Sequence, residues 1–145
     1  MPGITNPTEE YFKDGNWGWD GTRWRKLNLV FGYYDTTAEL LSNLNADSGQ
    51  NLLTGTVVPA GYVYVIQAAH AFDNTTDITQ IIITAVVSGI AVYMVLENPA
   101  GIGIPVVWVG QITLKAGDRM RASFYSCTAG DDIYFAYCGY KMMVS

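Results

Sequence analysis

Residues 81–96 read IIITAVVSGIAVYMVL and form the longest apolar run in the chain. A helix that crosses a membrane needs about 20 apolar residues, and this run is shorter and is interrupted at Ser88–Gly89. Ser-Gly marks tight turns, and the residues on both sides are largely of types that favour strands. The run therefore predicts a β-hairpin with its turn at Ser88–Gly89, and we expect no membrane association.

The rest of the chain continues in short segments that favour strands, separated by turn motifs such as PAG, DNTTD, NPAG, KAGD and TAGD. This spacing is typical of an antiparallel sandwich or barrel. One stretch, TTAELLSNL at 36–44, has instead the pattern of a short helix. The strand segments expected after the N-terminal region are 54–58, 62–72, 79–87, 90–96, 104–114, 119–125 and 132–144.

In an antiparallel strand pair with one face in water, that face should be clearly more polar than the other. In the 80–96 hairpin the difference in polarity between the two faces is small. One face is wholly apolar and is expected to form core. The other is also rich in apolar residues, and a monomer rarely leaves a large apolar patch in water. We expect a homotrimer or other closed oligomer to cover this face, unless the chain's own loop 97–110 or N-terminal segment does. The expected interface residues are Ile82, Val86, Tyr93 and Val95, with Val106 and Trp108 beside them.

Three of the four tryptophans lie in NWGWDGTRWRKL, residues 16–27. Asp-Gly is a strong signal for a two-residue hairpin turn, which would pair Trp19 with Thr22 and Trp17 with Trp24. Trp17, Trp19 and Trp24 would then share one face, as either a clasp buried against a neighbour or a glycan platform. We favour the clasp, with Arg23 and Arg25 at its edge to stack or to pair with carboxylates. Free quenching of these indoles by iodide in the assembled particle would instead indicate a platform.

Residues 119–144 are expected to form a hairpin around TAGD, which would place Cys127 opposite Asp132 and Cys138 opposite Arg121. That separation is too large for a disulfide, because bridged cysteines have Cα atoms less than about 7 Å apart. We therefore expect two free and mostly buried thiols.

Residue types that would support catalysis are sparse. His70 is the single histidine and is expected on the face of a strand with Tyr62, Tyr64, Ile66 and Ala68. The sequence has no nucleophile-elbow motif that would supply a serine for it to activate. No CxxC or HxxxH spacing is present. Asp118, Asp131 and Asp132 could converge at one end of a sandwich as a calcium site, although turn chemistry also explains them. We expect no catalytic activity, no cofactor and no essential metal.

Composition limits the class of partner. The 145 residues suit one domain, and charged residues make up 14%, against roughly 25% in an average soluble protein. A net charge of −5 leaves no basic footprint for direct nucleic-acid binding. The segment MPGITNPTEEYF has neither the cationic start nor the apolar region of a secretory signal, so synthesis in a cytoplasm is expected.

Two longer stretches resemble the compact jelly-roll domains of tailed-phage virion proteins. They are VPAGYVYVIQAAHAFDN at 58–74 and, at 112–142, a stretch with the turn pattern L-x-x-G-D at Leu114, Gly117 and Asp118. WGWDGTRWRKL is similar to short W-DG-x-W hairpins of phage fibres and attachment proteins. The resemblance implies an all-β antiparallel sandwich of jelly-roll type with about eight strands. An extended arm at 1–15 would precede a single domain at 16–145 that includes the tryptophan hairpin.

The resemblance also implies a place on a virion surface, in a trimer that contacts the major capsid protein or another virion protein. The chain lacks the long stalk that normally precedes a fibre tip, which favours a capsid decoration (cement) subunit made in the host cytoplasm. A receptor- or carbohydrate-binding head of a tail or head fibre is the main alternative. An enzyme, or a cytokine-like or lectin module outside virions, is a third.

Overall fold

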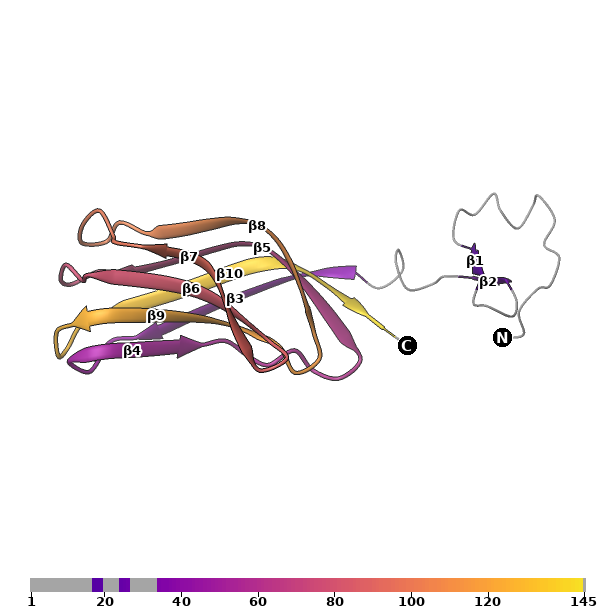
Figure 1. The fold of residues 1–145 in the computed structure, drawn as a ribbon, viewed down its shortest axis with the longest axis horizontal. Coiled ribbons are helices and arrows are strands. Elements are labelled where there is room, and N and C mark those ends of the chain that lie inside the picture. Colours follow the sequence, from indigo (N-terminus) through magenta and orange to yellow (C-terminus); the bar gives the residue numbers. More distant parts are fainter. Residues whose placement is uncertain (1–16, 20–23, 27–33, 145) are drawn as a thin grey trace.

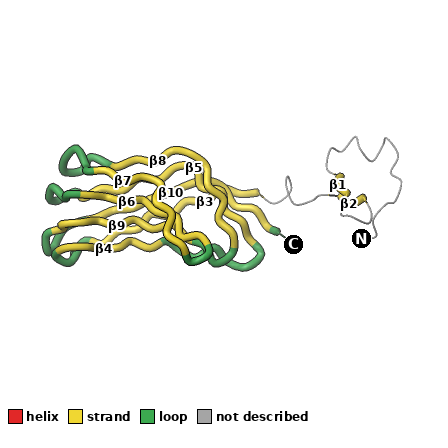
Figure 2. The backbone as a smooth tube through the Cα atoms, in the orientation of Figure 1, coloured by secondary structure: helices red, strands yellow, loops and turns green. Residues whose placement is uncertain are grey.

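The computed structural model describes residues 17–19, 24–26 and 34–144, and every regular element in them is a strand (Figures 1 and 2). Within these residues, no helix is long and apolar enough to cross a membrane. The strands are β1 (Trp17–Trp19), β2 (Trp24–Lys26), β3 (Tyr34–Asn43), β4 (Gly49–Thr54), β5 (Tyr62–Asp73), β6 (Gln80–Val87), β7 (Ile90–Glu97), β8 (Val106–Lys115), β9 (Arg119–Cys127) and β10 (Ile133–Met143).

Strands β3 to β10 form two four-stranded antiparallel sheets that lie face to face (Figure 1). One sheet has the order β3-β10-β5-β8 and the other the order β4-β9-β6-β7. Apart from the β6–β7 hairpin, each strand is followed along the chain by a strand of the opposite sheet. Counted from β3, the orders are 1-8-3-6 and 2-7-4-5, which is the double Greek key of a jelly roll. The predicted fold class is confirmed.

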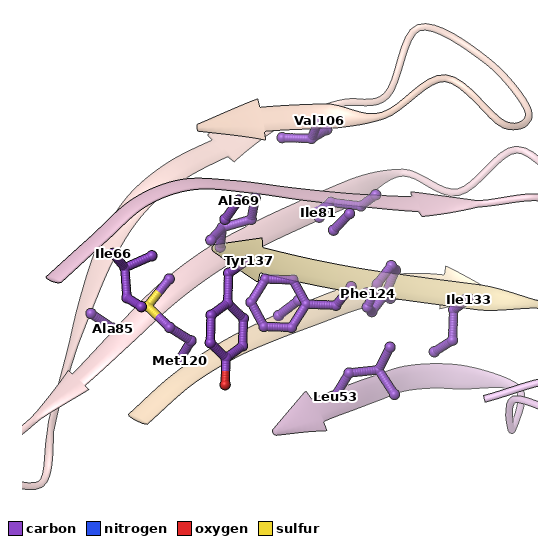
Figure 3. Packing of buried hydrophobic residues seen from close by; sticks show 14 of the residues in the cluster. Leu53, Ile66, Ala69, Ile81, Ala85, Val106, Met120, Phe124, Ile133 and Tyr137 are labelled. Atoms are coloured by element: carbon purple, nitrogen blue, oxygen red, sulfur yellow. The ribbon is translucent and has the colours of Figure 1, made fainter. Parts of the chain in front are cut away.

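The hydrophobic core lies between the two sheets and is built by residues that alternate along the strands (Figure 3). Phe124 of β9 and Phe135 of β10 are fully buried there, one from each sheet. The predicted core face of β6 is confirmed at Ile81, Ile83 and Ala85, none of which is exposed to solvent.

The β6–β7 hairpin has its turn at the predicted residues, with φ of 51° at Ser88 and 79° at Gly89. Its register shifts beyond the turn, because Thr84 pairs with Tyr93 while Ile83 pairs with Val95. The extra residue, Met94, forms a β-bulge that exchanges the faces of the residues after it. Val95 therefore packs against the core, contrary to the prediction.

Three other predictions of local structure are wrong. β9 and β10 do not pair, because the TAGD turn carries the chain from one sheet to the other. Residues 36–43 of this stretch belong to β3 instead of a helix, because pairing with β10 supplies ladder hydrogen bonds that a short helix with weak propensity cannot match. Residues 55–58 are not a strand, since the strand preceding them, β4, ends at Thr54.

The tryptophan-rich segment forms the two-stranded ladder β1–β2. Its register pairs Trp19 with Trp24 and Trp17 with Lys26. The predicted pairing of Trp19 with Thr22 is wrong, and four residues instead of two connect the strands. The register differs from the predicted one by two residues, which is an even number. By backbone register, Trp17, Trp19 and Trp24 therefore still fall at positions of the same face. The arm at 1–15 lies outside the described residues, and the predicted domain limits remain a prediction.

Candidate functional site

The outer face of the β3-β10-β5-β8 sheet is almost free of charged residues. We call its central part the β5 face and define it by the outward positions of its four strands in that part. In the central part, Cys138 pairs with Ala38 and Ala68 across the strands, and Ala136 pairs with Leu40 and His70. No Asp, Glu, Lys or Arg occupies these outward positions, which are Ala38, Leu40, Ser42, Ala68, His70, Phe72, Val107, Val109, Tyr134, Ala136 and Cys138.

A β-bulge determines which residues of β5 reach this face. In the pairing with β10, Cys138 lies opposite Ala68 and the next residue, Gly139, lies opposite Ile66, so Gln67 is an extra residue. Ile66 is fully buried in the core, whereas Ala68 and His70 lie on the outer face. His70 therefore does not share a face with Ile66, as the sequence had predicted.

Small side chains leave a hollow at the centre of the β5 face. The hollow has a volume of about 680 Å³ and is lined largely by apolar atoms. Ala38, Ala68 and Ala136 contribute only methyl groups to its lining, while larger side chains rise beside it. Leu40 is 69% exposed, Val107 51% and, next to the hollow, Val109 77%. Its lining is completed by Glu39, Ala69, His70, Phe72, Gly103, Pro105, Tyr137 and Cys138.

Three aromatic rings form a stack on this face. The ring centroids of Phe72 and Tyr134 lie 5.0 Å apart, and those of His70 and Phe72 lie 6.0 Å apart, with nearly parallel planes. His70 is half-buried and stacks on the Phe72 ring, and its imidazole makes no hydrogen bond to the part of the chain that the structure describes. His70 therefore lies in an aromatic stack, and its cross-strand partners on β10 and β8 are Ala136 and Val107, neither of which is a nucleophile.

A hydrogen-bonded carboxylate lies at the edge of the hollow. Glu39 of β3 accepts hydrogen bonds from the Tyr137 hydroxyl, from the Thr56 backbone N–H at 3.0 Å and from the Thr56 hydroxyl at 2.8 Å. Burial opposes ionisation of Glu39, but these three hydrogen bonds outweigh it and lower the pKa of the carboxyl. Burial and the bond to Glu39 raise the pKa of Tyr137. The carboxylate thus joins the two sheets, because Thr56 follows β4.

The outer face of the other sheet, which we call the β6 face, also exposes apolar side chains. Leu52 is 51% exposed, Tyr93 61% and Leu96 48%. By register, Leu96 is a neighbour of Ile82, and Tyr93 is a neighbour of Thr84. Arg121 pairs with Thr84 from the other side, and its Nε is buried without a hydrogen-bond partner.

The six predicted interface residues are not equally available for contact. Ile82 and Val86 lie on the β6 face but are only 4% and 8% exposed, since neighbouring strands flank β6 on both sides. Val106 belongs to the core, and Trp108 packs against it, so the prediction that they extend this surface is wrong. Tyr93 alone of the six offers a large exposed surface. Whether this face contacts another subunit remains a prediction.

The remaining predicted site residues are separated or lie outside the description. Trp17, Trp19, Trp24 and Arg25 belong to the β1–β2 ladder by their backbone, whereas Arg23 lies outside the described residues. Their role as clasp or platform remains a prediction.

The aspartates that could have converged as a calcium site are not brought together. Asp118 precedes β9 and Asp131 follows it, so they lie at opposite ends of this nine-residue strand. Buried Asp118 accepts backbone hydrogen bonds from Ser88 and Lys115, at 2.9 and 3.0 Å, and so joins two turns. The thiols of Cys127 and Cys138 are free as expected, but only Cys127 is buried.

No protein-family model matches the sequence, and a comparison with curated proteins gives no match. Solved structures with a similar fold include a proposed alpha-L-fucosidase of Bacteroides thetaiotaomicron VPI-5482, at TM-score 0.46 and 16% identity over 69% of this chain and 21% of that one. The STIV MCP has TM-score 0.49 and 13% identity over 92% of this chain and 47% of that one. A chain of the cyanophage Pam1 capsid has TM-score 0.48 and 11% identity over 88% of this chain and 97% of that one. The chain thus spans about one fifth of the length of the fucosidase and about half of the length of the STIV MCP.

Proposed function

We propose that this chain is a structural subunit of a tailed-phage virion, a capsid decoration (cement) protein that assembles through its outer sheet faces. The observation that carries the proposal is the β5 face, which joins an apolar hollow of about 680 Å³ to exposed Leu40, Val107 and Val109. Large exposed apolar patches mark protein interaction sites. The assignment to a virion is based on the sequence motifs that resemble phage jelly-roll proteins.

The occupant that we assign to the β5 face is a second copy of the chain. The central outward positions of this face carry no Asp, Glu, Lys or Arg, and the one carboxylate at the edge of the hollow, Glu39, is already held by hydrogen bonds from Thr56 and Tyr137. Two copies can therefore approach with little burial of like charges, although the chain has a net charge of −5. The side chains that rise beside the hollow, Leu40 and Val107, are of a size that can enter the hollow of a neighbour. Such a self-complementary contact is what a closed homo-oligomer requires.

A charge placed on the β5 face tests the assembly. Val107→Glu should convert the oligomer to a monomer with little change in melting temperature, because Val107 is 51% exposed in the subunit. Multi-angle light scattering measures the mass. The control is Ile90→Glu at the β6–β7 turn, where the residue is 67% exposed and the oligomer should survive. A wild-type chain that is monomeric at micromolar concentration, or an unaffected Val107→Glu oligomer, would contradict the assignment.

The decoration role needs a separate experiment on particles. Cryo-electron microscopy of the virion whose genome encodes this chain should find the jelly roll on the outside of the capsid shell. Addition of the purified chain to particles that lack it should raise the temperature at which they disrupt. Density at a fibre tip, with none on the shell, would reject decoration.

A carbohydrate- or receptor-binding head is the second candidate, because the His70–Phe72–Tyr134 stack lies on the same face as the hollow. Aromatic rings beside polar groups are a common platform for sugars. In that case Phe72→Ala should abolish glycan binding in an array experiment while the oligomer remains intact. If assembly buries the rings and no glycan binds, this candidate is eliminated.

A further inference from the structure

Two carboxylates and a thiol from three separate parts of the sequence meet inside one end of the sandwich. Asp73 ends β5, Cys127 ends β9, and Asp131 lies in the turn before β10. Their side chains are 3%, 4% and 1% exposed. One donor atom from each lies within 4.8 Å of the other two.

The hydrogen bonds around this cluster leave one carboxylate oxygen of Asp73 without a donor. Asp73 accepts the backbone N–H groups of Thr75 and Thr76 at Oδ1, whereas its Oδ2 is buried with no partner. Asp131 accepts bonds from Thr76 and Thr128 at Oδ2 only, which leaves Oδ1 as a possible donor atom to a ligand. A buried carboxylate oxygen without a partner is costly, so a positive species between these groups would stabilise them.

We propose that Asp73, Cys127 and Asp131 form a buried binding site for a divalent metal ion of the zinc class. Zinc binds both carboxylate oxygen and thiolate sulfur, and a tetrahedral ion holds such donors about 3.5 Å apart. Donor atoms already within 4.8 Å of one another need only small side-chain adjustments to reach that spacing. Calcium and magnesium fit less well, because they prefer oxygen ligands throughout.

Cys127 would bind the ion as a thiolate. Burial and the adjacent Asp73 and Asp131 carboxylates oppose loss of the thiol proton, so a divalent cation is needed to hold Cys127 as a thiolate. A bound zinc ion would displace that proton and accept the thiolate as a ligand, releasing the proton to solvent. Asn51 lies beside Cys127, but its side-chain oxygen already accepts a hydrogen bond from the Asp47 backbone N–H, so a water would complete a four-coordinate set.

The expected consequence is a structural metal that ties the end of β5, the end of β9 and the turn before β10. Sequence spacing could not reveal it, because 54 and 4 positions separate the three ligands along the chain and no metal-binding motif repeats. The expectation of no essential metal rested on motif spacing, and this geometry is the reason to revise it.

The test uses the full chain, stripped of metal with a chelator and then titrated with zinc chloride. Zinc should raise the melting temperature by several degrees, because a ligand that binds only the folded state stabilises it by mass action. Magnesium chloride should not. Cobalt(II) in place of zinc should give the near-ultraviolet charge-transfer absorption of a cobalt–thiolate bond.

Matched variants locate the site. Cys127→Ser should lose the cobalt–thiolate absorption, whereas Cys138→Ser, at the exposed cysteine, should keep it. Asp73→Asn should weaken zinc binding by at least about 100-fold, more than the loss of an outer-shell partner usually does, and Asp132→Asn in the same turn should not. If Cys127→Ser does not fold, the wild-type absorption and Asp73→Asn still decide the question.

Two results would overturn the proposal. Zinc stabilisation that persists in both Cys127→Ser and Asp73→Asn would place the metal elsewhere on the chain. If the melting temperature does not change on addition of zinc but rises as the pH is lowered, a proton shared by Asp73 and Asp131 takes the place of the metal.

Discussion

Tyr137 shows how one hydroxyl can join two sheets. It is a core residue of β10, 6% exposed, and its hydroxyl donates to Glu39 of the neighbouring strand. Glu39 also accepts two hydrogen bonds from Thr56, which follows β4 of the opposite sheet. Gly55 is required beside it, since a Cβ at that position would overlap the Tyr137 hydroxyl.

Removing that hydroxyl should destabilise the fold in a pH-dependent way. Tyr137→Phe is expected to lower the free energy of unfolding by about 1.5–3 kcal/mol at neutral pH, the range for a hydrogen bond to a charged group. The pKa of Glu39 is lowered in the folded state, so its contribution is complete above the ordinary value of 4.5 and is lost as the pH falls through the lowered pKa. Urea unfolding across this pH range should show the gap between wild type and variant closing in acid.

The control for this prediction is Tyr93→Phe, which deletes the same atom from a side chain that is 61% exposed. It should change the free energy of unfolding by no more than about 0.5 kcal/mol. An equal loss in both variants, or a Tyr137→Phe effect that does not depend on pH, would show that Glu39 and Tyr137 do not act as a pair.

At the scale of elements, irregularities in the strands decide which side chains reach which surface. The extra residue Gln67 in β5 turns Ala68 and His70 outward, and the extra residue Met94 in β7 turns Val95 inward. Opposite the first bulge, the register of β10 shifts between Cys138 and Gly139. A Cβ at Gly139 would overlap the Val65 carbonyl oxygen and lie 2.9 Å from the Ile66 Cα, so backbone occupies the space of any side chain.

Gly139→Ala should therefore destabilise the protein severely. Both β10 and β5 are internal strands and cannot move apart without breaking their ladders, so we expect a loss of at least about 3 kcal/mol in urea unfolding. Gly101→Ala is the control, because a Cβ there meets only the Ile104 Cδ1 atom, at 3.4 Å. Similar stability of the two variants would show that the strands accommodate a side chain at the bulge.

At the scale of the whole molecule, the sandwich encloses one core and leaves two apolar outer faces. Cys138 lies in the hollow of the β5 face and is exposed, whereas Cys127 is buried. Thiol reactivity therefore reports separately on assembly and on unfolding.

In the isolated subunit, a thiol reagent such as dithionitrobenzoate should label one cysteine per chain quickly and the second only in denaturant. In the assembled oligomer, labelling of Cys138 should slow by at least about tenfold, because the neighbouring copy covers the β5 face. The monomeric Val107→Glu variant should restore the fast rate, while the Ile90→Glu variant should not. Unchanged labelling of Cys138 in an oligomer would place the interface elsewhere, with the β6 face around Tyr93 the next surface to test.

Local sequence signals predicted the regular parts of this protein well. The Ser88–Gly89 turn, the core face of β6 and the position of most strands follow from turn chemistry and from alternation of side chains, which depend on neighbouring residues alone. The jelly-roll fold was predicted through the resemblance, and the strand order confirms it. The prediction of a helix at 36–44 failed because pairing with β10, which is remote in sequence, outweighs a weak local propensity.

What only the tertiary structure decided is which residues meet. A single extra residue reverses the faces of a strand, and no turn or glycine signal at Gln67 or Met94 marks a bulge. The sequence placed Cys127 opposite Asp132, in a hairpin that does not exist, because a turn motif does not reveal whether the next strand joins the same sheet. The jelly-roll crossings bring Asp73, Cys127 and Asp131 into one buried cluster and collect alanines from three strands into one hollow. Both depend on long-range strand order, which is set by the packing of the whole core and not by any local pattern.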